Sequence, residues 1–160
     1  MIKALASRGG VIHITFHDSF LSQEYANANR ALASEIASLE QAVNEKFGEN
    51  EARNLMELQR LSNASIRAGK LPQVSWEKIV DHIDHAVAIG GPDHVGVGSD
   101  FDGAFMPAGM EDASKFPAIT EGLLKSGYGE AAIRKILGEN TLRVMDDAER
   151  VGQQLRSENP

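Results

Sequence analysis

The 160-residue chain contains no cysteine. Disulfide bonds, thiolate metal sites and cysteine nucleophiles are therefore excluded, and any metal would have to be held by His, Asp or Glu. Basic residues are also scarce, with 16 Lys and Arg against 23 Asp and Glu and a formal net charge of -7. A chain of this charge repels a phosphate backbone, so we expect no nucleic-acid partner.

Long apolar runs are missing as well. No stretch of about 18 apolar residues could span a bilayer, and the first residues lack the apolar core of a signal peptide. We therefore expect a cytoplasmic protein without a membrane segment. What the chain does contain, 42% hydrophobic and 24% charged residues, is typical of a domain that buries a core.

Two segments are typical of strands. Residues 11–16 (Val-Ile-His-Ile-Thr-Phe) are β-branched and aromatic and follow Gly9-Gly10, which would end a short opening helix. Residues 94–100 form the second, whose glycines allow another backbone to approach closely. Both segments are apolar enough to predict interior strands. Helices between them make a parallel pair the expected arrangement, and hence an α/β fold.

The remaining segments predict helices. Residues 22–68 are rich in Ala, Glu and Leu with a break at Gly48, which indicates a helical hairpin. Ser75 is placed to cap a helix whose buried face is Trp76, Ile79, Val80, Ile83 and Val87. Three short helices are expected at about 117–126, 129–137 and 139–152, before a polar tail at 153–160. Two parallel strands need cover, so either another segment completes the sheet or the fold is largely helical.

Carboxylates follow the second predicted strand directly, in Gly-Ser-Asp-Phe-Asp-Gly at residues 98–103. The carboxyl end of a buried parallel strand is where α/β enzymes place reactive groups, which favours a functional Asp100. The alternative is an Asp-x-Asp-Gly turn whose side chains only bind nearby amides. A calcium loop is excluded because Ala104 and Phe105 occupy positions that need an oxygen ligand and glycine, and a phosphoryl-transfer role lacks its other motifs.

The histidines are weaker candidates for functional residues than Asp100. Residues 81–85 (Asp-His-Ile-Asp-His) have a metal-compatible spacing, but Ile83 belongs to the buried face, so His82 and His85 on its flanks are interpreted as structural. His13 and His17 lie within and just after the first predicted strand. His17, near the strand's carboxyl end together with Asp18, is the better site candidate.

Five blocks, taken in order, resemble the C-terminal region of the membrane (renal) dipeptidases, the zinc-dependent peptidase family M19. They are residues 9–12 (Gly-Gly-Val-Ile), 80–85 (Val-Asp-His-Ile-Asp-His), 93–103 (Asp-His-Val-Gly-Val-Gly-Ser-Asp-Phe-Asp-Gly), 109–112 (Gly-Met-Glu-Asp) with Phe116-Pro117, and 136–144 (Ile-Leu-Gly-Glu-Asn-Thr-Leu-Arg-Val). The blocks cover nearly the whole chain, and their order is far more specific than any one of them.

The resemblance implies a (β/α)8 TIM barrel of the metal-dependent hydrolase type, with two zinc ions, that hydrolyses dipeptides. The family's zinc ligands, an early His-x-Asp, a bridging Glu and two later His, lie upstream of residues 11–16, so no metal ligand is expected here. The same holds for its substrate-carboxylate arginine, a role that Arg8 does not take. Asp100 matches the family's catalytic and substrate-binding aspartate. Phe20 falls at a substrate position that is often tyrosine.

The sequence thus predicts a zinc-dependent dipeptidase. Residues 1–152 would form the C-terminal part of its barrel, with a helical insertion at about 22–70 and a polar tail at 153–160. The expected partners are a dipeptide and either the remaining barrel segment or a second copy of the chain. Alone, the chain is expected to hold no zinc and to be inactive. The alternative is an inactive fragment or a helical module that binds a partner through exposed strand edges.

Overall fold

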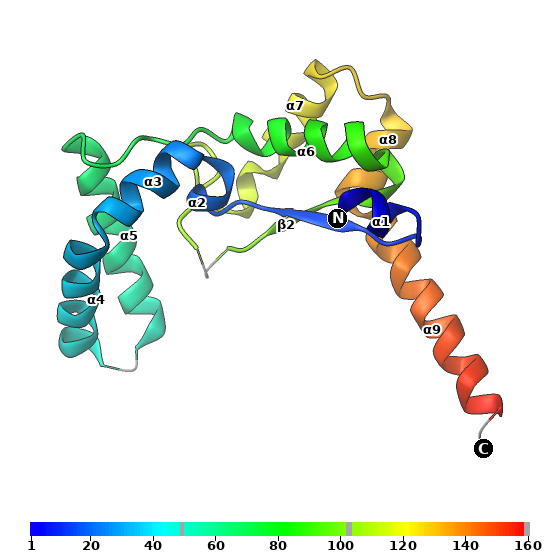
Figure 1. Cartoon of the computed structure of the whole chain (residues 1–160), viewed down its shortest axis with the longest axis horizontal. Helices are drawn as coiled ribbons and strands as arrows, with labels where there is room; N and C mark the ends of the chain where they lie inside the picture. Colours follow the sequence, from blue (N-terminus) through cyan, green and yellow to red (C-terminus); the bar gives the residue numbers. More distant parts are fainter. Residues whose placement is uncertain (49, 102–103, 159–160) are drawn as a thin grey trace. The chain divides into compact units, whose positions relative to one another are not determined.

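The computed structural model describes residues 1–48, 50–101 and 104–158. It is a largely helical α/β fold with one sheet, formed by β1 (Ile12–Thr15) and β2 (Val95–Ser99). The helices in chain order (Figure 1) are α1 (Ile2–Ala6), α2 (Asp18–Leu21), α3 (Gln23–Ala31), α4 (Ala33–Phe47), α5 (Glu51–Arg67), α6 (Glu77–Gly90), η1 (Pro92–His94), η2 (Ala113–Lys115), α7 (Phe116–Lys125), α8 (Glu130–Arg134), η3 (Lys135–Glu139) and α9 (Asn140–Glu158). None of the described helices has the length and apolar composition needed to cross a bilayer.

The chain forms two compact units. The first comprises Met1–Ile14, Ile79–Gly98 and the residues from Pro117 onward, and the second comprises Thr15–Lys78 and Ser99–Phe116. Each strand therefore begins in the first unit and has its last residue in the second. The described residues supply two strands, whereas a closed (β/α)8 barrel needs eight.

The two strands run parallel, as the sequence predicts. Gly96 lies against His13, Gly98 lies against the Ile14 carbonyl, and the Phe16 amide donates to the Ser99 carbonyl at 2.9 Å, so the pairing advances in the same direction on both. A Cβ atom built at Gly96 would lie 2.7 Å from His13 Cδ2. The prediction that the glycines permit close approach is confirmed.

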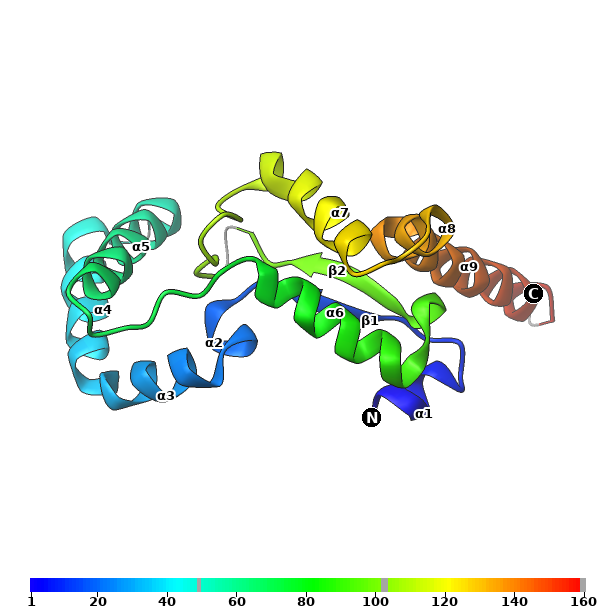
Figure 2. The same ribbon diagram turned by 90° about the horizontal axis from the view of Figure 1, so that it is seen from above.

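Helix α6 supplies much of the first unit's core. Its buried residues are Ile79, Val80, Ile83 and Ala86, so the predicted face is confirmed except that Ala86, not Val87, completes it and Trp76 precedes the helix. Figure 2 shows α6 and α7 running along the strands. The core also includes Ile14, Val95, Ile119, Leu123, Ile133 and Ile136.

The strands are less buried than predicted. Only Ile14 of β1 is buried, and the neighbouring His13 is exposed. Alternate residues of a strand face opposite sides of the sheet, so Ile14 packs into the core while His13 points to the other face. A two-stranded sheet cannot cover both faces, which is why the strands are not fully interior.

The first residues of α9 hold the N-terminal end of β2 in place. Asn140, which is 2% exposed, donates from Nδ2 to the carbonyls of Pro92 at 2.7 Å and Val95 at 2.9 Å. Arg143 donates to the carbonyls of Gly9 at 2.9 Å and Asp93 at 3.2 Å. The two side chains thereby join the beginnings of α9, β2 and the segment before β1.

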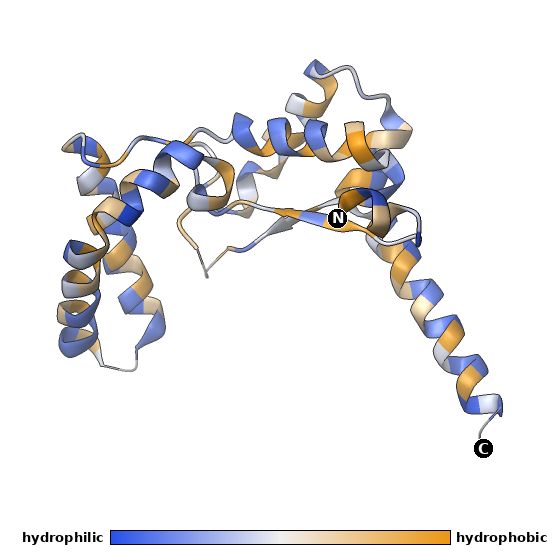
Figure 3. Ribbon diagram, viewed as in Figure 1, coloured by the Kyte–Doolittle hydropathy of each residue, from blue (hydrophilic) through white to orange (hydrophobic). Residues whose placement is uncertain are grey.

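The last helix is longer than predicted. Helix α9 continues to Glu158 instead of ending at about residue 152, so residues 153–158 of the predicted polar tail are helical and exposed. The segment contains good helix formers and no proline before the last residue, which lets the helix propagate. Apolar residues recur along α9 (Figure 3), where Leu142, Met145, Val151 and Leu155 are exposed.

The second unit is built around the predicted helical hairpin. Helices α4 and α5 contact one another, and Gly48 ends α4 with a positive φ of 59°, which confirms the break. The Tyr25 hydroxyl of α3 hydrogen bonds to Ser62 of α5 at 3.2 Å. Beside the strand ends, three aromatic rings pack together with centroids 5.8 to 6.0 Å apart: Phe16, Phe101 and Phe116.

Candidate functional site

The carboxyl ends of β1 and β2 bring together the side chains that the sequence favours. His17 follows β1 by two residues and Asp100 follows β2 directly. Thr15 Oγ1 lies 3.4 Å from Asp100 Oδ2, which makes a long and weak hydrogen bond. The Asp100 side chain is exposed, so most of its acceptor capacity is available to a ligand.

The backbone at this strand end is unusual. Ser99 has φ of 50° and Asp100 has φ of 78°, and they are the two described non-glycine residues with positive φ. This conformation costs an L-residue roughly 1–2 kcal/mol, and Asp tolerates it better than most. Backbone strain of this kind clusters at functional sites, which supports a functional role for Asp100 over the plain turn. Asp102 and Gly103 of the same motif lie outside the described residues.

The His17 side chain is half-buried, and its ring is held in place by a hydrogen bond and by two neighbouring aromatic rings. Its Nδ1 accepts a hydrogen bond from the Ser19 amide at 3.1 Å, so the neutral ring carries its proton on Nε2. The ring packs against Phe20, with centroids 5.0 Å apart, and against Phe105 at 6.5 Å. Burial lowers the pKa of His17, and the negative charge of Asp100 opposes this shift. The charge of Asp100 thus acts on the His17 ring at this edge of the sheet.

Phe20 lies in α2 and is 65% exposed. It places an apolar ring over His17 at the end of β1. A ring in this position can contact a ligand through its face but cannot donate a hydrogen bond. Its substrate-binding role stays a prediction.

Asp18 is the residue that sequence reasoning undervalued. It is 3% exposed, and its Oδ1 has no hydrogen-bond partner among the described residues. Burial raises the pKa of Asp18 to about 7. The sequence placed Asp18 at the strand end but gave no sign of its burial, because the covering loop comes from residues far along the chain, where the Phe105 carbonyl accepts from the Asp18 amide at 3.1 Å.

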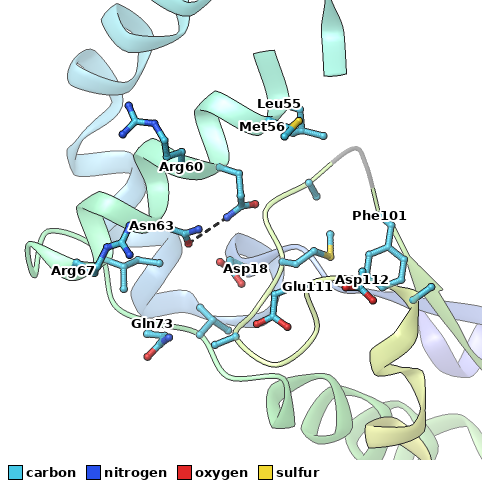
Figure 4. A pocket seen from close by; sticks show the side chains of 17 residues that line it. Asp18, Leu55, Met56, Arg60, Asn63, Arg67, Gln73, Phe101, Glu111 and Asp112 are labelled. Atoms are coloured by element: carbon cyan, nitrogen blue, oxygen red, sulfur yellow. Dashed lines mark hydrogen bonds between the residues drawn. The ribbon is translucent and has the colours of Figure 1, made fainter. Parts of the chain in front are cut away.

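Asp18 borders a cavity of about 770 Å³ in the second unit. Figure 4 shows it between α5, which carries Asn63 and Arg67, and the loop that carries Glu111 and Asp112. The cavity has both apolar and charged walls, as small-molecule sites do. Its volume and mixed lining make it a candidate ligand site.

The other histidines that the sequence offered lie outside the strand-end site. His13 Nε2 hydrogen bonds to Thr141 Oγ1 at 2.8 Å, and Asp84 accepts from Ser126 Oγ at 3.0 Å. His82 and His85 flank the buried Ile83 on α6, as the helical phase predicts. The described residues contain no group of three or more His, Asp or Glu that could hold a metal ion, so the residues present do not fit the zinc centre that the family resemblance implies.

Comparison with known proteins identifies the family. The sequence model of the membrane dipeptidases, peptidase family M19, matches residues 1–159. Dipeptidase verJ of Clonostachys rogersoniana is 44% identical over 81 residues, which are 50% of this chain and 21% of that protein. Dipeptidase ataJ of Aspergillus terreus is 45% identical over 82 residues, 51% of this chain and 20% of that protein.

A comparison with solved structures finds the same family. The probable dipeptidase PvdM of Pseudomonas aeruginosa superposes with a TM-score of 0.59 and 26% identity, covering 89% of this chain and 38% of that one. The chain thus spans about a fifth of the length of the two curated relatives. Since the family match extends over nearly every residue, the chain belongs to the membrane dipeptidase family, peptidase family M19.

Proposed function

We propose that this chain is the C-terminal part of a zinc-dependent dipeptidase, with β1 and β2 as two strands of a (β/α)8 barrel and Asp100 as the carboxylate that acts on the substrate. The observation that carries the proposal is the position of Asp100, exposed and with a positive φ, directly after β2, at the edge of the sheet where His17 follows the parallel strand β1. The dipeptidase names of the relatives support it. They also favour it over a helical module that only binds a partner.

The proposal assigns the zinc ligands to a part of the enzyme that this chain does not cover. The described residues hold no metal-binding cluster, and the chain spans 38% of the PvdM structure. The chain alone is therefore expected to show no dipeptidase activity. In the proposed enzyme, this chain supplies side chains that act on the substrate and supplies no zinc ligands.

Asp100 has the properties of a substrate-side proton carrier. Peptide hydrolysis adds the oxygen of a water molecule to the carbonyl carbon and requires the leaving amine to gain a proton. An exposed carboxylate at the strand end can accept a hydrogen bond from the substrate ammonium, take up the proton that the attacking water releases and pass it to the leaving nitrogen. Thr15 steadies one oxygen by its long hydrogen bond. His17, with its proton on Nε2, can donate to a substrate oxygen, and Phe20 offers an apolar surface beside it.

The test is Asp100→Asn in the enzyme completed with the segment that carries the zinc ligands. We expect turnover to fall by about 100-fold or more, since proton transfer contributes roughly 10²–10⁴-fold, with zinc content unchanged. Asp146→Asn, an exposed change on α9, is the matched control. If zinc were lost in step with activity, Asp100 would be a metal ligand and the assigned role would be wrong.

A further inference from the structure

The cavity beside Asp18 is distinct from the strand-end pair. It is lined by α5, the segment at residues 73–74, the residues from 104 to 113, Phe101 and Asp18 (Figure 4), and Asp100 is not among its described lining residues. Its volume of about 770 Å³ lies within the range of small-molecule sites. The cavity can therefore hold a ligand without using the groups assigned to hydrolysis.

Asp18 presents an unsatisfied acceptor at this cavity. Its carboxyl group is almost fully buried, and Oδ1 finds no donor among the described residues. Buried polar atoms are nearly always hydrogen-bonded, so an unpartnered oxygen on a residue that lines a cavity indicates a missing donor. An N–H group of a ligand would satisfy it, and an ammonium group would do so most strongly because the hydrogen bond would be charge-assisted.

The two walls differ in charge. On α5, Arg67 is exposed and makes no ion pair among the described residues, whereas Arg60 is held by Glu57 at 2.9 Å. On the opposite wall stand Glu111 and Asp112. Figure 4 shows Asp18 between these walls. A ligand with a carboxylate at one end and an ammonium group at the other matches this distribution.

Apolar side chains line the space between the charged groups: Leu55, Ile66, Val74 and Met106. These side chains would pack against the aliphatic part of a ligand. We propose that the cavity binds a zwitterionic ligand of amino-acid or dipeptide size, with its ammonium group on Asp18 and its carboxylate on Arg67. The inference goes beyond the proposed hydrolysis at Asp100 and does not require it, because the site would bind substrate or product without cleaving it.

Binding should depend on pH through Asp18. Burial raises the pKa of this group to about 7, so at pH 6 most of the carboxyl is neutral and at pH 7.5 most is ionised. The charged residues Arg60, Arg67, Glu111 and Asp112 line the same cavity, Tyr25 interacts electrostatically with Asp18, and His17 precedes Asp18 in the chain. Burial raises the pKa of Tyr25, which stays neutral, and lowers the pKa of His17, which favours its neutral form. Ionised Asp18 attracts an ammonium group, so affinity should rise with pH.

The test is calorimetric titration of the chain with L-alanyl-L-alanine. We expect the dissociation constant to fall roughly eightfold between pH 6 and pH 7.5, following the ionised fraction of Asp18. In Asp18→Asn this pH dependence should vanish, and affinity at pH 7.5 should drop about tenfold or more. Arg67→Gln, an exposed change that cannot disturb the core, should also weaken binding, while Arg53→Gln on the same helix should not.

Three results would overturn the inference. The first is no binding by the native chain at millimolar peptide, and the second is equal binding of N-acetyl-L-alanyl-L-alanine or L-alanyl-L-alaninamide, which lack one charge each. The third is loss of binding in Asp100→Asn with Asp18→Asn and Arg67→Gln unaffected, which would place the ligand at the strand ends. Circular dichroism of each variant confirms its fold. Failure of the proposed hydrolysis would appear only in the turnover of Asp100→Asn, so the two outcomes are separable.

Discussion

Asp18→Asn should stabilise the protein at neutral pH. The pKa of Asp18 is 3.8 in its ordinary state and about 7 in the folded chain. Between these values the unfolded chain loses this proton while the folded chain keeps it, so stability falls as pH rises from about 4 to about 7 and stays low above that. The shift corresponds to roughly 4 kcal/mol at pH 8. This is an upper limit, because a cavity of this size can admit water.

The asparagine variant removes the ionisation and keeps the shape. Urea unfolding followed by circular dichroism at pH 4.5, 6 and 8 gives the free energy of unfolding for both proteins. The advantage of Asp18→Asn should be small at pH 4.5 and grow to a few kcal/mol at pH 8. Taking the difference between variants cancels the titration of His17 and the other groups. An advantage that is the same at every pH would refute a buried neutral carboxyl, and Asp146→Asn should show no such growth.

Three further outcomes are expected. Gly109→Ala should destabilise the chain by about 2–4 kcal/mol in urea unfolding, because φ is 88° and the new Cβ would lie 2.5 Å from Trp76 Cδ1; a loss below about 0.5 kcal/mol would contradict the close contact. Asn140→Ala should cost about 1–3 kcal/mol by leaving the Pro92 and Val95 carbonyls without their donor, and a neutral result would show that water replaces the amide. The chain alone should self-associate at micromolar concentration through β1, β2 and the apolar face of α9, which light scattering across dilution can measure, and a monodisperse monomer would contradict this.

The fold was predictable where the signal is local. Glycines at the ends of α1 and α4, helical periodicity in α6 and the β-branched run before Phe16 each act over a few residues, and all these elements are present. The extent of strand burial was not predictable, because it depends on how many strands the sheet contains. The predicted end of α9 at about residue 152 is too early, because the polar residues that follow it also favour a helix.

The candidate site was predictable only in part. Asp100 and His17 could be found because the ends of parallel strands meet at one edge of the sheet. Asp18 has the same position in sequence, yet its burial arises from the loop at Phe105, about 90 residues further along, and no local pattern reports such a contact. The left-handed backbone at Ser99 was likewise invisible, because serine is not a residue that marks this conformation.

The backbone strain at Ser99 and Asp100 places selection for thermal stability in conflict with selection for activity. Glycine adopts a φ of 50° at no steric cost, so Ser99→Gly would relieve the strain and make the protein more resistant to heat. The same change would give the backbone before Asp100 more conformational freedom. Under the role proposed for Asp100, a laboratory screen of the completed enzyme for thermostability would therefore enrich substitutions at position 99 that lower turnover, and a screen for turnover would discard them.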